Sequence, residues 1–544
     1  MLSEPRAWLR SNSAMALALA LGLAALYLAA ATGRLFGDDT FFVKLVERGG
    51  TFTTHPLYLP SARLIRALTA FLGVRDPYTS LRVLSAVAGG AGAAFFFLAA
   101  LSLGARRRTA LLWAGLLATT PSYAFFASQA EVHALHMAAV TFGGFAVARL
   151  RQGVRPASLA LVSSAAVLIA GTHQSGLQLL PGLYLLALWL ARGAPWRMTV
   201  ADLGALLAPL AAAAVAVCAH AAAVYGSPFA WRSYFGSTRD VLLSQMRAGL
   251  PAEFLLGYVA TDWIAPAAGI VMCGCLALGA VVREHWRLGS IGLLLIAPHV
   301  VLFSFFHFEQ RGAYLLPTLP VLLAAIAELW SLPRSATPMK MIVGFFGTGV
   351  AIALSAVAAA MGYDRVLREV PPPILVGAAG FCFVVGVATG AAVAGLRGLW
   401  IWGLWALLPL QCIGTALSLR EYGRDRPVES WASGAKGLME GPKKCYLLTD
   451  GFDEYQYADW VCGPGVVYTI PQIFEAAGGS VDGLEGLLRS KLTEGEQILL
   501  DERVRVALAP FPEMAAVLAE LEQRFVLDPA SGGSFRGFWL RIRQ

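Results

Sequence analysis

The stretch AMALALALGLAALYLAAA, residues Ala14–Ala31, decides the fold class of this chain. It contains no charged residue and is long enough to cross the hydrocarbon core of a bilayer as one helix. It is too long for the apolar core of a signal peptide, and no clear small-residue cleavage site follows it. We therefore interpret it as a retained membrane helix.

The composition of the whole chain agrees with this interpretation. Apolar residues make up 57% of the 544 residues and charged residues only 14%, whereas soluble domains carry about 25% charged residues. A soluble core stops growing at a few hundred residues, so this much apolar surface needs lipid as its solvent. The composition therefore predicts a polytopic membrane protein and gives no indication of nucleic-acid binding.

Apolar runs of about 17–25 residues predict about thirteen spanning helices. These runs lie at residues 14–32, 80–104, 109–127, 131–150, 157–172, 176–191, 200–225, 263–282, 288–306, 312–330, 341–361, 373–396 and 398–419. Arginines and lysines gather in alternate short loops, for example Arg106–Arg108 and Arg149–Arg155. The positive-inside rule then predicts a cytoplasmic N-terminus, with residues 33–79 and the C-terminal tail on the extracytoplasmic face. Frequent alanine, leucine and arginine are compatible with a bacterial inner (plasma) membrane, although an endoplasmic-reticulum protein would look similar.

The tail has a different pattern from the rest of the chain. Short apolar runs alternate there with helical stretches such as Pro512–Phe525, and we predict strands at Cys445–Leu448, Val466–Ile470, Gln497–Leu500 and Phe538–Ile542. The predicted fold class is thus an all-α polytopic membrane protein (residues 1–420) with a small C-terminal α/β extracytoplasmic domain (residues 421–544). The sequence leaves open whether Cys445 and Cys462 form a disulfide.

Adjacent carboxylates, Asp38 and Asp39, follow the first predicted span. One interpretation is catalytic, because a carboxylate can take the proton from an attacking hydroxyl. The other is structural, because an aspartate at the start of a helix over Thr40–Arg48 would cap it. The residues alone leave both open.

Two further polar groups lie at predicted span ends on the same side. Glu309 and Arg311, followed by Tyr314, suit either phosphate binding or an interfacial anchor. Glu131 and His133 suit either a pocket wall or a capped helix start, and His173 suits a pocket or a hydrogen-bonded structural turn.

The spacing of these groups fits no tight metal site and no phosphate-cradling loop. Their common side is more informative, because helix ends at one level can close around one cavity.

These residues resemble motifs of the GT-C superfamily of membrane glycosyltransferases. Gly37-Asp38-Asp39 with His55-Pro56-Leu57-Tyr58 resembles the acidic first-loop motif of a bacterial branch related to the eukaryotic transmembrane O-mannosyltransferase. Ser128–Leu135 is similar to that branch's Glu-Val-Tyr-x-Leu segment, with His133 where tyrosine is usual. Glu309–Pro317 is similar to the Arg-Tyr-Leu-x-Pro segment of protein O-mannosyltransferases and aminoarabinose transferases.

The resemblance implies transfer of a sugar from a polyprenyl-phosphate donor to an acceptor hydroxyl on the extracytoplasmic face, with inversion. Carried over by motif, Asp38 is the expected catalytic carboxylate, with Asp39 beside it. Many members have Asp-Glu or Asp-Ser here, so which aspartate is the base stays open. The resemblance further implies donor-phosphate binding by Arg311, His55 and Lys44, and a pocket formed by Glu131, His133, His173, Glu309 and Tyr314.

Two other functions fit the spans. A secondary transporter or lipid flippase would place its functional charges near the bilayer midplane and show internal repeats, and the sequence shows neither. A membrane assembly subunit would use the tail to dock a partner. The sugar, the acceptor (protein, lipid or polysaccharide), any divalent-cation requirement and the oligomeric state are not given by the sequence.

Overall fold

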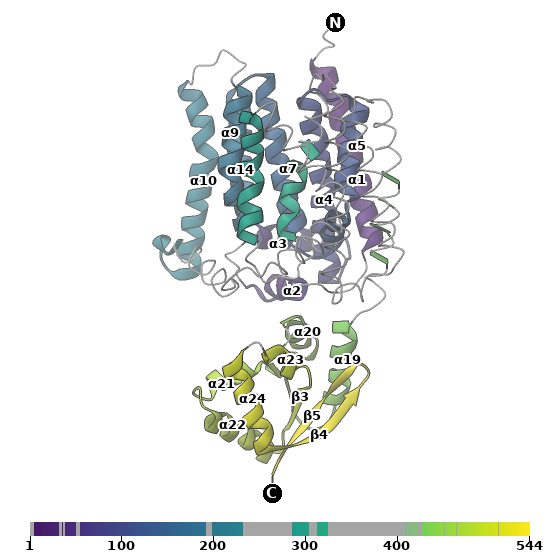
Figure 1. Ribbon diagram of the computed structural model, residues 1–544, viewed down its shortest axis with the longest axis vertical. Coiled ribbons are helices and arrows are strands. Elements are labelled where there is room, and N and C mark those ends of the chain that lie inside the picture. Colours follow the sequence, from purple (N-terminus) through teal and green to yellow (C-terminus); the bar gives the residue numbers. More distant parts are fainter. Residues whose placement is uncertain are drawn as a thin grey trace, which may run out of the picture. The chain divides into compact units, whose positions relative to one another are not determined.

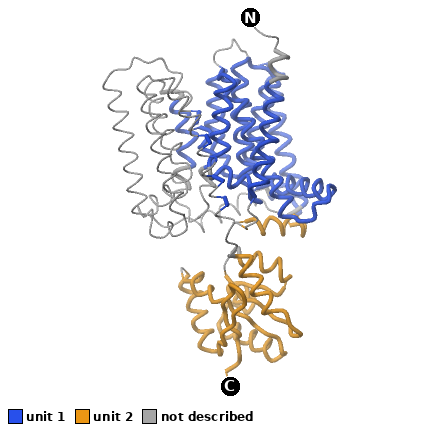
Figure 2. Tube along the Cα trace, turned by 90° about the vertical axis from the view of Figure 1, so that its right-hand side faces the viewer, with its two compact units in different colours: residues 1–32, 51–421 blue, residues 33–50, 422–544 orange. Residues whose placement is uncertain are grey.

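The chain folds into two compact units in a computed structural model. One unit contains residues 1–32 and 51–421, and the other contains residues 33–50 and 422–544 (Figure 2). The structure describes residues 5–31, 35, 38–50, 55–191, 199–231, 286–303, 313–321, 323–324, 408–409, 412, 415–416, 419–420, 427–450, 452–463, 465–509 and 511–543.

The first unit is helical throughout its described residues. Its elements are α1 (Pro5–Ala30), α3 (Tyr58–Phe71), α4 (Pro77–Ser102), α5 (Arg107–Ala118), α6 (Pro121–Ser128), α7 (His133–Arg149), η1 (Leu150–Gln152), α8 (Pro156–Thr172), η2 (Gln174–Leu179), α9 (Leu180–Ala191), α10 (Val200–Tyr225), η3 (Pro228–Trp231), α14 (Trp286–Phe303) and η5 (Ala313–Thr318).

Four helical stretches in the described part of the chain are long and apolar enough to cross a membrane. They are Asn12–Ala30, Pro77–Ser102, Gln174–Ala191 and Val200–Ala223. Helices α5 and α6 would add a fifth span if the pair, bent by 70°, crosses as one. The predicted spans at 263–282, 341–361 and 373–396 lie outside the described residues, as do part of the span at 312–330 and most of the span at 398–419. The predicted total of about thirteen therefore stays a prediction.

Helix α4 lies between α1 and α7 (Figure 1). Small residues on α4 allow this close packing: a Cβ atom at Gly90 would lie 2.2 Å from the backbone oxygen of Ala20 on α1. Two tyrosine hydroxyls link further helices of this unit. Tyr27 of α1 donates to the carbonyl of Ala118 of α5 at 2.8 Å, and Tyr123 of α6 donates to that of Gly89 of α4 at 2.6 Å. Small residues and buried hydrogen bonds are the usual means by which helices associate in lipid.

The second unit contains a mixed sheet and its covering helices. Its elements are α2 (Asp39–Arg48), α19 (Pro427–Met439), β1 (Cys445–Leu448), α20 (Phe452–Cys462), β2 (Val467–Tyr468), α21 (Ile470–Ala476), α22 (Val481–Thr493), β3 (Gln497–Asp501), α23 (Val504–Leu508), α24 (Pro512–Arg524), β4 (Phe525–Gly532) and β5 (Phe535–Ile542). The strand order is β2-β1-β3-β5-β4, with β1 parallel to both its neighbours and β5 antiparallel to both of its own.

Both faces of the parallel strands are buried. Tyr446 and Leu448 of β1 pack in a core with α21 to α24, whereas Cys445 and Leu447 pack in a second core with α19 and α20. An uninterrupted apolar strand is typical of a parallel strand covered on both sides. Cys445 and Cys462 are free thiols in this arrangement.

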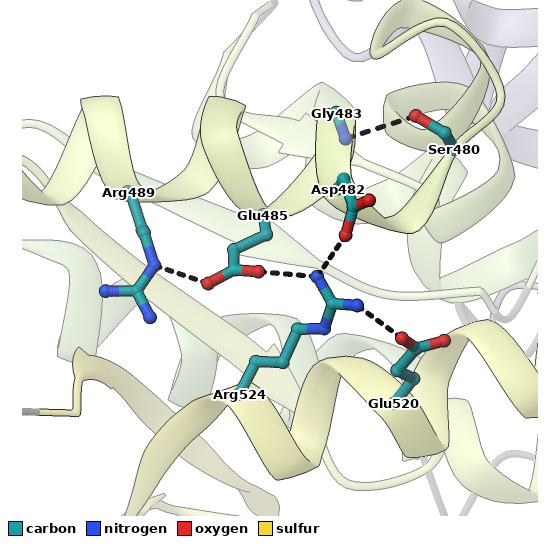
Figure 3. A network of polar contacts seen from close by, with 7 residues as sticks. All are labelled: Ser480, Asp482, Gly483, Glu485, Arg489, Glu520 and Arg524. Carbon is teal, nitrogen blue, oxygen red and sulfur yellow. Dashed lines mark hydrogen bonds and ion pairs between the residues drawn. The ribbon is translucent and has the colours of Figure 1, made fainter.

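A cluster of charges fastens α24 to α22 at the surface of this unit (Figure 3). Arg524 of α24 donates to Asp482 and to Glu485 of α22 at 2.6 Å each, and it also pairs with Glu520 of its own helix. Glu485 in turn accepts from Arg489 at 2.6 Å. Exposed ion pairs of this kind contribute little to stability individually.

Residues 33–50, which contain the predicted carboxylates, pack with the C-terminal residues as one unit (Figure 2). The sequence predicts the whole first loop, residues 33–79, as part of the transmembrane domain, and that division stays a prediction. Residues 33–50 make hydrogen bonds with residues more than 390 positions later, described below.

Candidate functional site

Asp38 and Asp39 stand at the first turn of α2. Asp38 is the N-cap residue, and its backbone carbonyl accepts the first helical hydrogen bond from Phe42 at 2.9 Å. Its side chain makes no capping hydrogen bond. The capping role that we considered from the sequence is therefore not what the Asp38 carboxylate does.

The two carboxylates have different surroundings. Asp39 is fully buried as the first helical residue, where the helix dipole favours a negative charge. Burial raises the pKa of the Asp38 carboxyl from 3.8 to about 6. A carboxylate with such a pKa is ionised at neutral pH and holds a proton more tightly than an ordinary aspartate, which suits a general base.

Lys44 lies on the same helix and faces α20. Its ammonium pairs with the carboxylate of Asp459 and donates to Gln456 Oε1 at 2.8 Å. Helix α2 ends one turn later at Gly49, whose φ of 78° is a left-handed conformation that favours glycine.

A histidine cluster occupies the first unit. The ring of His173, in the turn between α8 and η2, has its centroid 4.4 Å from that of His55 and 5.7 Å from that of His133. His55 comes from the turn before α3, and His133 is the first residue of α7. The structure thus brings together three residues that the sequence placed in three separate motifs.

Hydrogen bonds to backbone carbonyls hold these motifs in contact. The peptide N–H of Leu57 donates to the carbonyl of Gly171 at 2.8 Å, near the end of α8. The hydroxyl of Tyr58, which is fully buried, donates to the carbonyl of Ala130 at 3.2 Å. The His-Pro-Leu-Tyr stretch is therefore fixed to the segments that carry His133 and His173.

Glu131 lies beside this cluster in the sequence and is buried at the start of α7. Its carboxylate accepts from the N–H of Val132 at 3.3 Å, and its carbonyl accepts from the hydroxyl of Ser85 at 3.1 Å. The first contact joins Glu131 to the residue that precedes α7, and α7 has no side-chain cap.

Two more histidines belong to this region. His136 of α7 has its ring centroid 5.3 Å from that of His173, and its Nδ1 lies 3.1 Å from the Thr172 hydroxyl. His299 of α14 is fully buried and close enough to interact electrostatically with both. His136 follows His133 by one helical turn, which is a usable sequence signal. His299 sits in an apolar run, where an ionisable residue is itself a sign of function.

The structure describes only some of the remaining predicted site residues. Glu309 and Arg311 lie outside the described residues, and Tyr314 is in η5, which contacts α7 and α14. Asp38, Asp39 and Lys44 belong to one unit, whereas His55, Glu131, His133 and His173 belong to the other. Among the residues that the structure describes, no three His, Cys, Asp or Glu side chains are arranged to hold a metal ion.

Comparison with known proteins gives likeness of structure only. No family model and no curated protein matches the chain. The structure of ArnT from Cupriavidus metallidurans bound to undecaprenyl phosphate is similar over 99% of each chain, with 13% identity and a TM-score of 0.54. The apo structure of the same protein is 15% identical over 99% of this chain and 98% of that chain, with a TM-score of 0.49. The arabinofuranosyltransferase AftD from Mycobacteria is 13% identical over 100% of this chain and 40% of that chain, with a TM-score of 0.42.

The likeness to ArnT extends over nearly the whole of both chains and so concerns the complete fold. The chain therefore shares its overall fold with ArnT and contains apolar helices long enough to cross a membrane. The GT-C superfamily and its O-mannosyltransferase branch stay predictions from the sequence motifs.

Proposed function

We propose that this chain is a glycosyltransferase that moves a sugar from a polyprenyl-phosphate carrier to an acceptor hydroxyl on the extracytoplasmic face of the membrane. The observation that carries the proposal is the fold shared over 99% of each chain with a protein whose solved structure holds undecaprenyl phosphate. A polyprenyl carrier also suits a chain rich in membrane-spanning helices, since its lipid tail stays in the bilayer.

Asp38 is the general base in this proposal. Its pKa of about 6 leaves it ionised at neutral pH but a better proton acceptor than an ordinary aspartate. Asp39 is fully buried at the first turn of α2, where the helix dipole stabilises its negative charge. Asp39 then helps to set the field around Asp38.

The reaction is a single displacement. Asp38 takes the proton of the acceptor hydroxyl while that oxygen forms a bond to the anomeric carbon of the sugar. The bond between this carbon and the phosphate oxygen breaks, and its electron pair leaves with the polyprenyl phosphate. Attack opposite the leaving group inverts the anomeric configuration.

Negative charge grows on the phosphate as it leaves, so fixed positive charge and hydrogen-bond donors there lower the barrier. Arg311 and His55 are the proposed phosphate-binding residues. The resemblance also implied Lys44, but the ammonium of Lys44 pairs with Asp459. Glu131, His133, His173, Glu309 and Tyr314 form the proposed pocket. The contacts of His173 with His55 and His133 support one continuous polar surface in the first unit.

The placement of the histidines favours an enzyme over a transporter. His55, His133 and His173 stand at the ends of helices, where α8 finishes and α7 begins. Secondary transporters usually hold their substrate and coupling ions near the bilayer midplane, at interrupted helices.

The test is sugar transfer by purified full-length protein from a panel of radiolabelled polyprenyl-phosphate sugars. We expect turnover with at least one donor and a loss of about 10²–10⁴-fold in kcat for Asp38→Asn, because a general base contributes that much. Asp39→Asn should retain more activity than Asp38→Asn.

The matched control is Asp528→Asn, which removes a surface carboxylate paired with Arg541 in the C-terminal residues. It should transfer sugar at the wild-type rate. Turnover with no donor, or turnover undiminished in Asp38→Asn, would overturn the proposal.

A further inference from the structure

The helix that carries the proposed base is held to the C-terminal part of the second unit by a buried carboxylate. Asp459 of α20 pairs with Lys44 and, at 3.0 Å, with Arg48 of α2. The Asp459 side chain is only 9% exposed and that of Lys44 only 13%. Lys44 and Arg48 are one helical turn apart, so both cations lie on one face of α2.

Aromatic rings complete this contact. The Lys44 ammonium lies 5.4 Å from the ring centroid of Tyr455, and the Arg48 guanidinium lies 5.8 Å from that of Trp460. Both distances fall within the range of cation–π attraction. The cations of α2 therefore meet a surface of α20 that matches them in charge and in shape.

A second contact fixes the chain just before the aspartates. The backbone N–H of Leu35 donates to Glu429 Oε1 of α19 at 2.9 Å. Asp38 follows this attachment by three residues and precedes Lys44 by six. The proposed base thus stands between two points that are both attached to the C-terminal residues.

We propose that Asp459 is a positioning residue, which acts through Lys44 and Arg48 to hold α2 so that Asp38 meets the acceptor hydroxyl. This inference rests on the proposed function, since it concerns the same base. It assigns to the C-terminal residues a part in catalysis, although they contribute no atom to the reaction.

The physical reason lies in the burial of the contact. A carboxylate withdrawn from water is stable only while its cations are in place, so the contact has a defined geometry rather than a range of surface positions. A general base must lie within hydrogen-bond reach of its proton, and a displacement of 1 Å can cost about 100-fold in rate.

The test combines two measurements on full-length protein, with Asp459→Asn as the variant and Asp528→Asn as the matched control. Hydrogen–deuterium exchange over residues 39–50 reports whether α2 stays docked. Kinetics with the polyprenyl-phosphate sugar report whether the base is in place. We expect Asp459→Asn to raise exchange over residues 39–50 and to lower kcat about ten- to hundredfold, with the donor KM within twofold.

A double-mutant cycle separates this role of Lys44 from phosphate binding. If Lys44 acts through Asp459, Lys44→Met should reduce kcat much less in the Asp459→Asn background than in the wild type. If Lys44 binds the donor phosphate directly, Lys44→Met should raise the donor KM equally in both backgrounds, which would contradict the proposal.

The two proposals can fail separately. Unchanged exchange over residues 39–50 in Asp459→Asn overturns the inference whatever the activity, and so does raised exchange with unchanged kcat. If the wild type transfers no sugar, the proposed function fails while exchange still decides whether Asp459 holds α2.

Discussion

The carboxylates at the start of α2 and the histidines around His173 are both polar groups withdrawn from water, but burial affects them differently. An aspartate keeps its charge at neutral pH and responds to burial with a raised pKa, so it becomes a better proton acceptor. An imidazole can lose its charge and still donate and accept hydrogen bonds. The two regions therefore differ in chemistry: the aspartate is a strengthened proton acceptor, whereas the imidazoles offer neutral hydrogen-bonding groups.

The largest expected effect concerns the pH dependence of the carboxylate region. A protonated Asp38 cannot accept the hydroxyl proton, and the pKa of this carboxyl is about 6. We therefore expect kcat to be level above pH 7 and to fall about tenfold per pH unit below pH 6, reaching about 100-fold at pH 4. Steady-state kinetics with saturating donor from pH 4 to pH 8 measure this.

Asp528→Asn, which removes a surface carboxylate paired with Arg541, serves as the control for this profile and should keep its acidic limb near pH 6. A kcat that does not change between pH 4 and pH 7 would show that Asp38 is not the general base.

A smaller effect is expected from a substitution in the histidine region, and it should appear in the KM for the sugar donor. His136 is 2% exposed, and its Nε2 has no hydrogen-bond partner among the described residues. An unsatisfied buried nitrogen costs stability unless a ligand meets it. We expect His136→Phe to raise the donor KM about tenfold and to raise the melting temperature of the ligand-free protein.

His220→Phe is the matched control, because His220 is an exposed histidine on α10. It should change neither quantity. A normal donor KM in His136→Phe would show that the cluster is structural and would leave only the carboxylate region as a site.

The smallest effect is one of stability at the carboxylate region. The pKa of Asp38 is raised on folding, so this group lowers stability as the pH rises from 3.8 to about 6, and the cost persists above that. Asp38→Asn removes the charge and should stabilise the protein at pH 7.5 by on the order of 1 kcal/mol, with no gain at pH 3.5. Unfolding followed at both pH values checks this, and destabilisation at pH 7.5 would contradict it.

Local patterns predicted much of the architecture. The predicted strand Cys445–Leu448 is strand β1, and Gln497–Leu500 lies within β3, because short apolar runs between turn residues specify buried strands. The predicted helix Pro512–Phe525 differs from α24 by one residue. The apolar runs near residues 80–104 and 200–225 likewise correspond to long helices.

Long-range contacts could not be predicted in the same way. Lys44 gives no sign in the sequence that its partner is Asp459, because an ion pair between distant segments leaves no local pattern. His299 is different, because an ionisable residue inside an apolar run is a sequence signal, although its neighbours cannot be read from the sequence. The sequence predicted that His55, His133 and His173 lie on the same side of the membrane. It could not predict the contacts between their rings, because these depend on how α7 and α8 pack.

The contact between Arg48 and Asp459 spans 411 positions of the chain, which bears on how the protein is made. At about 5–20 residues per second, translation needs roughly 20 to 80 s after the first loop emerges before α20 exists. Throughout that interval α2 has no surface to dock on, while the helices between them enter the bilayer. The surroundings of α2 are therefore completed only after most of the chain has been made, because Asp459 is translated 411 positions after Arg48.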